Sequence, residues 1–387
     1  MTKKRAIVQV LPALQQGGVE RGTIEIAEAL QKRGITNYVI SSGGKMVEEL
    51  TNIGVEHIAL PVKTKNPIKM WLNSYRLAKI FKDKNVGLVH VRSRAPAWSV
   101  KWACNRVHLP FIATFHGLYG TKPESLKKPY NRVMTQGKLV VAVSSFIHQH
   151  LMKEYNIADQ KIRLIPRGAD INKFDISKIT QTQLDEFIKE YDIPTDKPII
   201  TLAGRLSRIK GHSVVLDAIK QMKNQNVTLL FVGGNPKGDY EAELNAKLAE
   251  LPQSVSFKKF AVSGDKMPLV YALTDIYVQP TLVPESFGRS IAEAQAMGKI
   301  VVASNHGGAC ELILNNQTGF LTPVGDSKIL SAMLDKIMEM TEEEKTKIGQ
   351  KATESVRTNF SIQKMCDRTI AMYNEILGNE LDYNKEK

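Results

Sequence analysis

Residues 276–303 read IYVQPTLVPESFGRSIAEAQAMGKIVVA, and this stretch points to the fold class of the whole chain. The runs at 276–279 and 300–303 are short and apolar, as in buried strands. Between them, 290–297 has the apolar spacing of a helix. A strand, a helix and another strand in this order predict a parallel βαβ unit.

The same alternation runs through the rest of the chain. Strands are expected at 6–11, 38–41, 88–91, 111–114, 139–143, 162–165, 199–203, 228–232 and 255–257. Helices are expected at 21–33, 67–82, 95–106, 146–155, 213–222, 239–250 and 267–273. This rhythm predicts an α/β fold of two Rossmann-like doubly wound domains that face each other across a cleft.

A length of 387 residues fits two domains of ordinary size. The first is expected at 1–170 and the second at 171–360, with a helix and a connector between 175 and 197. Residues 341–377 are expected to be helical, and 361–387 form a terminal helix and a polar tail. The apolar stripe of that helix consists of Met365, Ile370, Tyr373 and Ile376.

The composition is that of a globular protein, with 43% hydrophobic and 24% charged residues. Cys104, Cys310 and Cys366 are odd in number and far apart, which supports neither a disulfide framework nor a zinc cluster. No apolar run reaches the roughly 18 residues of a spanning helix. We therefore expect a cytoplasmic protein, either soluble or peripheral at the inner face of the plasma membrane.

The positive charge is concentrated in one part of the chain. The formal net charge is +14, from 53 Lys and Arg against 39 Asp and Glu. Residues 63–138 hold 16 of these basic residues and only Asp83 and Glu124 as acids, so this span alone carries +14. Such an excess indicates an anionic partner, such as a membrane surface, an acidic acceptor or nucleic acid. A merely solvated basic face is the alternative.

Two carboxylates stand out between 280 and 294. Glu285 is expected on the loop after a strand, beside free amides from Ser286 to Gly288, and Glu293 in the first or second turn of the next helix. A loop carboxylate beside free amides can hold sugar hydroxyls, and a helical carboxylate can accept both hydroxyls of a ribose. The alternative for Glu293 is a carboxylate that only interacts with the positive end of the helix dipole.

Two loops contain residues that can bind a phosphate. Gly17 and Gly18 precede a helix, and Gly204-Arg205 ends a strand with Lys210 five residues after the arginine. Amides at a helix start and two cations favour a diphosphate. A tight turn at the first loop and a surface pair of cations at the second are the alternatives. Because neither loop is G-x-G-x-x-G, a Rossmann dehydrogenase is disfavoured.

Longer motifs extend these observations. Residues 285–326 contain E-S-F-G-R-S-I-A-E-A-Q-A-M-G, then G-G-A-C-E-L-I and T-G-F-L-T-P-V-G-D. G-G at 17–18, T-F-H-G at 114–117, I-P-R-G-A-D at 165–170, and G-R-L with K-G between 204 and 211 precede them. In this order the motifs resemble the family 4 retaining glycosyltransferases of the GT-B fold, of the type that builds bacterial cell-envelope polysaccharide or lipopolysaccharide. The E-x7-E pattern with its flanks is the specific part of the resemblance.

The resemblance implies how the donor, a nucleotide-diphosphate sugar, is held. Glu293 would bind the ribose. Glu285, with Ser286 and the amides of Phe287 and Gly288, would hold the sugar.

The resemblance also implies the catalytic groups, which are His116, Glu285, Arg205 and Lys210. Arg205 and Lys210 would neutralise the leaving diphosphate, helped by the amides at Gly17 and Gly18. His116 would line the sugar near the reacting carbon, and the last helix would cross back to the first domain. No D-x-D pair stands near a strand end, so neither a metal nor another cofactor is expected.

Some positions depart from the family pattern. Arg167 stands where Asn is usual and Lys299 where Pro is commoner, and neither is expected to contact the donor. H-V-R-S-R at 90–94 has no family counterpart. Its Arg92 and Arg94 follow a strand and either face an anionic acceptor or lie on a solvated loop.

The expected activity is sugar transfer to an acceptor hydroxyl in surface polysaccharide or lipopolysaccharide biosynthesis. The alternative is a glycolipid synthase acting on phosphatidylinositol or diacylglycerol. Residues 67–84 combine apolar and basic side chains, which indicates either a helix that docks on anionic lipid or an ordinary packed helix. A nucleic-acid-binding protein is disfavoured because the basic span contains no recognised module.

Overall fold

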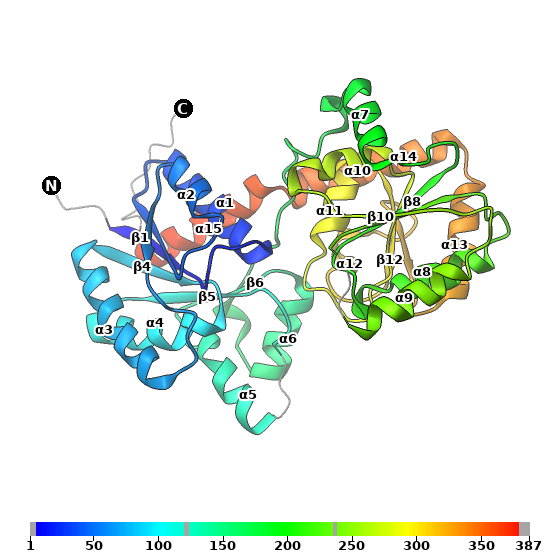
Figure 1. Cartoon of the computed structure of the whole chain (residues 1–387). Helices are drawn as coiled ribbons and strands as arrows, with labels where there is room; N and C mark the ends of the chain where they lie inside the picture. Colours follow the sequence, from blue (N-terminus) through cyan, green and yellow to red (C-terminus); the bar gives the residue numbers. More distant parts are fainter. Residues whose placement is uncertain (1–4, 120–123, 235–237, 379–387) are drawn as a thin grey trace. The chain divides into compact units, whose positions relative to one another are not determined.

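The computed structural model describes residues 5–119, 124–234 and 238–378. The chain divides into two compact units, one formed by 1–167 with 363–387 and the other by 168–362 (Figure 1). The division falls after Arg167, close to the boundary expected at 170, and the last helix belongs to the first unit.

The first unit contains a parallel sheet in the order β3-β2-β1-β4-β5-β6-β7. Its strands are β1 (Ala6–Val10), β2 (Asn37–Ser41), β3 (Glu56–Ala59), β4 (Val86–Val91), β5 (Phe111–Phe115), β6 (Val140–Ala142) and β7 (Ile162–Leu164). The chain leaves β1 toward one edge and returns at β4 toward the other. The carboxyl ends of β1 and β4 therefore form a topological switch point.

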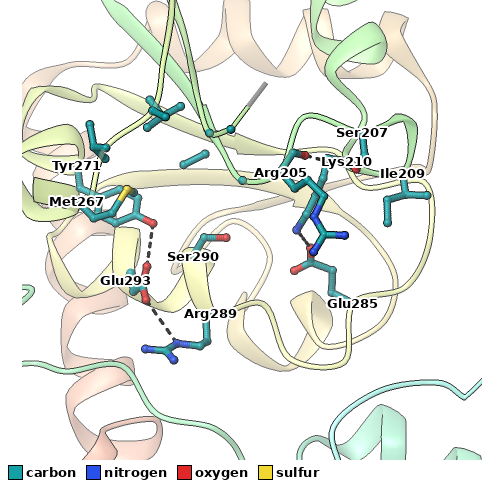
Figure 2. Close-up of a pocket in the computed structure, with 17 residues that line it drawn as sticks. Arg205, Ser207, Ile209, Lys210, Met267, Tyr271, Glu285, Arg289, Ser290 and Glu293 are labelled. Atoms are coloured by element: carbon teal, nitrogen blue, oxygen red, sulfur yellow. Dashed lines mark hydrogen bonds and ion pairs between the residues drawn. The ribbon is translucent and has the colours of Figure 1, made fainter. Parts of the chain in front are cut away.

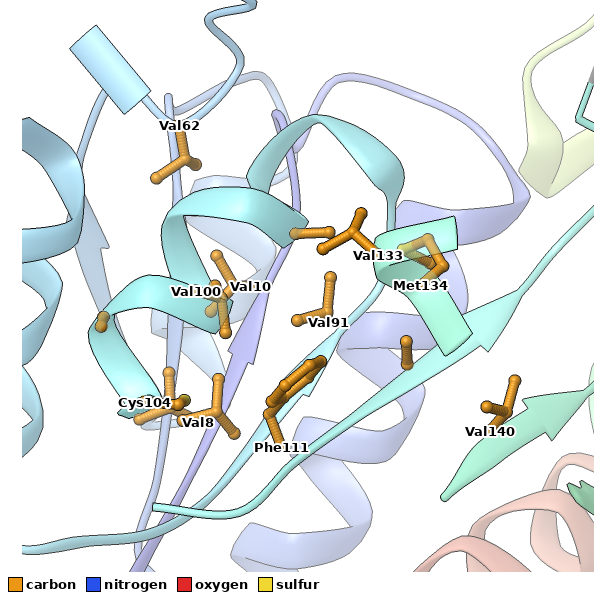
Figure 3. Packing of buried hydrophobic residues seen from close by; sticks show 14 of the residues in the cluster. Val8, Val10, Val62, Val91, Val100, Cys104, Phe111, Val133, Met134 and Val140 are labelled. Carbon is orange, nitrogen blue, oxygen red and sulfur yellow. The ribbon is translucent and has the colours of Figure 1, made fainter. Parts of the chain in front are cut away.

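Helices cover both faces of this sheet, with α1, α2 and α15 on one side and α3 and α4 on the other (Figure 1). They are α1 (Gly18–Lys32), α2 (Val47–Asn52), α3 (Pro67–Asp83), α4 (Arg94–Val107), α5 (Glu124–Asn131), α6 (Ser145–Tyr155) and α15 (Ile362–Leu377). Figure 3 shows Val8, Val10 and Val91 of the sheet packed beside Val100 of α4. Gln9, between the two valines, points to the other face and donates to the Thr23 carbonyl in α1, as the alternation of a strand requires.

The terminal helix α15 is fastened to the first unit by polar contacts. Cys366 donates to the Glu25 carbonyl, and Tyr373 lies 2.6 Å from His90 between hydroxyl oxygen and Nδ1. The helical stretch expected at 341–377 is in fact two helices. α14 (Glu342–Asn359) ends before Phe360, and α15 begins at Ile362, so that the first packs in one unit and the second in the other.

The second unit repeats the plan with a parallel sheet in the order β10-β9-β8-β11-β12-β13. Its strands are β8 (Ile199–Ala203), β9 (Thr228–Val232), β10 (Ser256–Phe260), β11 (Ile276–Gln279), β12 (Ile300–Ser304) and β13 (Phe320–Thr322). Its longer helices are α7 (Gln181–Tyr191), α8 (His212–Gln221), α9 (Asp239–Ala249), α10 (Met267–Leu273), α11 (Arg289–Ala296), α13 (Ser327–Met338) and α14, and α12 (Ala309–Leu312) is a single turn. Ile200 and Leu202 face one apolar cluster while Ile199 and Ala203 face another.

These two sheets confirm the predicted doubly wound α/β class. Among the described strands and α-helices, the sequence patterns did not predict six: β3, β13, α2, α5, α12 and α13. Most of them are short, and β3 has no fully buried residue, so its apolar signal is weak. Among the residues described, the helices are all too short or too polar to cross a lipid bilayer.

Candidate active site

A pocket of about 600 Å³ opens in the second unit at the carboxyl ends of its central strands (Figure 2). Its polar wall comes from the loop after β8, from α10, from the loop after β11 and from α11: Arg205, Ser207, Lys210, Tyr271, Glu285, Arg289, Ser290 and Glu293. Neighbouring strands β8 and β11 lead to helices on opposite faces of the sheet. The pocket is thus at the switch point of this sheet, where open α/β folds bind ligands.

Glycines let the loops of this pocket pack backbone against backbone. Gly211 has φ +76°, and a Cβ there would lie 1.9 Å from the Pro280 carbonyl oxygen. A Cβ on Gly233 would lie equally close to the Gly204 carbonyl oxygen. Only glycine fits these approaches, which bring the loops after β8, β9 and β11 together.

Glu285 is held by a chain of hydrogen bonds. It forms an ion pair with Lys210 and accepts from the Gln279 amide nitrogen. The amide oxygen of Gln279 in turn accepts from Ser290 and from the Tyr277 hydroxyl, the latter at 2.9 Å. Burial raises the pKa of Tyr277, which keeps this hydroxyl a donor. The carboxylate is thereby fixed at the pocket wall with about a fifth of its side chain exposed.

Glu293 stands in the second turn of α11 and also lines the pocket. It accepts from the Tyr271 hydroxyl at 3.0 Å, and Arg289 Nε lies 3.5 Å from its other oxygen. Burial, and then the neighbouring carboxylate, raise the pKa of Tyr271 well above its usual range. Tyr271 therefore stays protonated and orients the carboxylate (Figure 2).

Backbone contacts with Gly308 hold the loop that connects Glu285 to Glu293. Gly308 donates its amide to the Glu285 carbonyl at 2.7 Å, and a Cβ on Gly308 would lie 2.5 Å from the Phe287 carbonyl oxygen. Phe287 is buried, and Gly288 is the N-cap of α11 with φ +98°. The second glycine of G-G-A-C-E thus supports the E-x7-E loop, which relates two motifs that the sequence shows separately.

Of the residues predicted for the donor, the structure brings Arg205, Lys210, Glu285 and Glu293 to one pocket. Ser286 follows Glu285 on the same loop. No motif of the sequence indicates the side chains that position the carboxylates, Tyr271, Gln279, Ser290 and Arg289. All four lie in or beside predicted elements, but only the fold shows which of their side chains meet.

Gly17, Gly18 and His116 lie in the first unit, where Arg167 contacts Gly18 and His116. Arg167 donates to the Gly18 carbonyl, and its Nη1 lies 3.4 Å from His116 Nδ1. Burial, followed by the charges of Arg92 and Arg167, lowers the pKa of His116 well below its usual range. The imidazole of His116 is therefore neutral at pH 7. Arg167, which replaces the usual Asn, contacts two of the predicted site residues.

Arg92 and Arg94 have different surroundings. Arg92 is 2% exposed, so the solvated-loop alternative is wrong for it. Burial lowers the pKa of Arg92, while the nearby Tyr373 and Glu25 oppose that shift. Arg94 begins α4, donates to Asn131 Oδ1 at 2.9 Å and stacks over the ring of Tyr119 at 4.3 Å. Arg94 also lines a pocket of the first unit.

Two doubly wound units, one with cations and oriented carboxylates at its switch point, are the architecture of a GT-B glycosyltransferase. Family models agree: "Glycosyltransferase Family 4" matches residues 16–173, and "Glycosyl transferases group 1" matches 184–355. The chain belongs to family 4 of the GT-B glycosyltransferases.

Individual relatives cover nearly the whole chain. A crystal structure of a glycosyltransferase from Rickettsia africae ESF-5 is 39% identical, with a TM-score of 0.90, and spans 97% of this chain and 99% of that one. Anabaena HepE, solved in complex with UDP and glucose, is 23% identical with a TM-score of 0.79, over 96% and 99%. An Escherichia coli UDP-Gal:alpha-D-GlcNAc-diphosphoundecaprenol alpha-1,3-galactosyltransferase is 24% identical over 97% of this chain and 98% of its own.

Proposed function

We propose that this glycosyltransferase moves a hexosyl group, with retention, from a UDP-sugar to an acceptor hydroxyl in cell-envelope polysaccharide or lipopolysaccharide biosynthesis. The observation that carries the proposal is the pocket that joins Arg205 and Lys210 to Glu285 and Glu293. Cations suit a diphosphate, and fixed carboxylates suit the hydroxyls of a ribose and a hexose. Uridine as the base is supported by the UDP bound to HepE and by the UDP-Gal donor of the E. coli relative.

In the proposed reaction the leaving diphosphate is stabilised by protein cations and not by a metal ion. Lys210 is the central group in this proposal, because its ion pair with Glu285 fixes the ammonium at the wall of the pocket. Arg205 is exposed at the rim and can turn its guanidinium to phosphate oxygens. Cations placed where charge develops stabilise the transition state without reorganising at that moment.

Retention follows, in this proposal, from attack on the same face that the diphosphate leaves. The bond between the anomeric carbon and the diphosphate oxygen breaks, and the acceptor oxygen forms its bond to that carbon. The acceptor proton moves to the departing diphosphate. Glu285 is paired with Lys210 and Gln279, which favours a binding role for it over that of a covalent nucleophile.

His116 is proposed to contact the donor sugar near the reacting carbon. Its low pKa keeps the ring uncharged, so it can accept or donate a hydrogen bond without adding a second cation to Arg167. The amides at Gly17 and Gly18 are proposed to add to the binding of the diphosphate at the start of α1.

Attachment to an anionic bilayer is the proposed means of reaching a lipid-linked acceptor. One side of α3 is buried, and the other exposes an apolar stripe at helical spacing. The exposed fractions are 70% for Ile68, 48% for Trp71, 44% for Leu72 and 47% for Tyr75. The cations Lys69, Arg76, Lys79 and Arg106 are exposed on α3 and the neighbouring α4. Aromatic and aliphatic side chains among cations suit an anionic lipid surface.

Sedimentation with vesicles tests this attachment. Vesicles of phosphatidylcholine with phosphatidylglycerol should bind the wild type at low salt, and Trp71→Glu with Leu72→Glu should abolish binding. Ile329→Glu, at an exposed apolar position of α13 in the other unit, should leave binding intact. Absence of wild-type binding removes the membrane from the proposal.

Transfer assays test the function itself. Purified protein is supplied with UDP-glucose, UDP-galactose or UDP-N-acetylglucosamine, and with either saccharide-diphosphate-lipid acceptors or phosphatidylinositol and diacylglycerol. We expect a product with the saccharide acceptor, an α-linkage by NMR, and full activity in EDTA. Transfer only to phosphatidylinositol or diacylglycerol would replace the proposal by the glycolipid-synthase alternative. Loss of activity in EDTA would contradict metal independence.

A further inference from the structure

A second pocket, of about 720 Å³, lies in the first unit and has a different charge pattern. It lies beside the carboxyl ends of β1 and β4, which is the switch point of that sheet. The residues that line it are Pro12, Lys63, Lys65, Ser93, Arg94, Ala95, Lys127, Tyr130 and Asn131. Four of these described residues are cations, and none is an acid.

The cations of this pocket have no acidic partner among the side chains that the structure describes. Among those side chains, no carboxylate forms an ion pair with any of the four, which are Lys63, Lys65, Arg94 and Lys127. Like charges around one cavity disfavour one another, and an anion between them relieves the repulsion. The pocket therefore favours a negatively charged occupant over a neutral one.

Arg94 gives the pocket a fixed element. Its Nη1 donates to Asn131 Oδ1 at 2.9 Å, and its guanidinium stacks over Tyr119 at 4.3 Å from the ring centre. Asn131 is fully buried and so provides a rigid acceptor. A guanidinium held on one edge presents its remaining donors in a constant direction, which suits the paired oxygens of a phosphate.

The start of α4 adds backbone donors to the same cavity. Ser93 is the N-cap of this 14-residue helix, and its hydroxyl makes no capping hydrogen bond. Ser93 and Ala95 both line the pocket. The first-turn amides, together with the helix dipole, add to the positive potential that Arg94 and the three lysines create.

We infer that this pocket binds a phosphoryl group carried by the acceptor, so that the enzyme selects an anionic, phosphate-bearing acceptor over a neutral sugar. The inference rests on the proposed function for the word acceptor, but anion binding at the pocket stands without it. The same phosphoryl chemistry is available from a sugar phosphate or from a lipid diphosphate.

Calorimetric titration with inorganic pyrophosphate, in the presence of saturating UDP, tests the pocket directly. We expect binding by the wild type and a loss of about tenfold or more in affinity in Lys63→Gln/Lys65→Gln, because two charge-assisted contacts are removed. Both lysines are exposed, so this variant should fold. Arg94→Gln should show the same loss. Lys153→Gln on α6, a matched exposed lysine outside the pocket, should bind as the wild type does.

Further arms separate the inference from the proposed function and sort the two sources. Lys210→Gln should retain pyrophosphate binding, because Lys210 lines the second-unit pocket and not this one. That result would support anion binding at the first-unit pocket even if the protein binds no UDP and the proposed function fails. Farnesyl diphosphate binding more tightly than pyrophosphate assigns the phosphoryl group to a lipid, and equal binding assigns it to a soluble or saccharide-borne phosphate. No binding of pyrophosphate by the wild type, or equal binding by the wild type and Lys63→Gln/Lys65→Gln, would overturn the inference.

Discussion

The two units use one strand plan and place different charges at the same point of it. In both sheets the order reverses beside the first strand of the unit, β1 or β8, and a pocket lies at the carboxyl ends there. The second-unit pocket mixes Arg205, Lys210 and Arg289 with Glu285 and Glu293. Among the described residues that line the first-unit pocket, the charged ones are all cations.

This difference shows that the fold supplies the position and the loops supply the chemistry. Mixed charges can bind a ligand that carries both a diphosphate and many hydroxyls. Cations without carboxylates select for negative charge alone. We therefore assign the donor to the second unit and the phosphoryl group of the acceptor to the first, as proposed above.

The largest effect is expected at the ion pair of the second-unit pocket. Glu285→Ala or Lys210→Ala should lower kcat/KM on the order of a thousandfold, because each removes a group aimed at the donor sugar or the leaving diphosphate. Steady-state transfer assays and a thermal melt measure activity and folding separately. Full activity in either folded variant would break the proposed division between the units.

The corresponding change in the first-unit pocket should act on the other substrate. Lys63→Gln/Lys65→Gln should raise KM for a phosphate-bearing acceptor about tenfold and leave KM for the UDP-sugar unchanged. Kinetics with each substrate varied in turn give both constants. A parallel rise in both KM values would mean that the pockets are not specialised as inferred.

Stability should respond to acid through His212, at the start of α8 beside the second-unit pocket. Burial lowers the pKa of His212 to about 4, below its usual 6.5. Because the unfolded chain takes up this proton first, the free energy of unfolding falls as the pH drops from 6.5 to 4, by up to about 3 kcal/mol. Urea denaturation across this range should show a shallower pH dependence for His212→Gln. Identical slopes for the two proteins would contradict the shift.

A smaller effect is expected when only the orientation of a carboxylate is lost. Tyr271→Phe removes the hydrogen bond to Glu293 but leaves the carboxylate and its partner Arg289. Affinity for UDP should fall by about threefold to tenfold, the value of one hydrogen bond. Calorimetry on the variant measures it, and affinity for pyrophosphate at the first-unit pocket serves as the internal control. A loss as large as that of Glu293→Ala would show that Tyr271 does more than orient.

The alternating pattern was enough to predict the fold class and the strands that carry the site. The strand β11 and the helix α10 begin and end where the sequence places them, because loop residues bound the apolar pattern of each element. The E-x7-E motif is also local, since Glu285 and Glu293 are joined by one loop and one helix. Local signals of this kind survive without knowledge of the tertiary structure.

The charge pattern of the first-unit pocket could not be predicted from local sequence signals. Lys63 and Lys127 are far apart in sequence, and only the sheet order and the path of α4 bring them to one cavity. Likewise, α3 has two apolar stripes, and the sequence does not show which is buried. For Arg92, proximity to a strand end suggested a ligand or solvent, whereas packing against α1 and α15 buries it.

Calorimetric titration with UDP in metal-free buffer can establish whether the second-unit pocket is the donor site. We expect binding by the wild type, binding weakened at least tenfold in Glu293→Gln, and unchanged binding by Glu186→Gln, a matched exposed carboxylate on α7. Equal UDP affinity in the wild type and Glu293→Gln, or no UDP binding by a cooperatively folded wild type, would contradict this assignment.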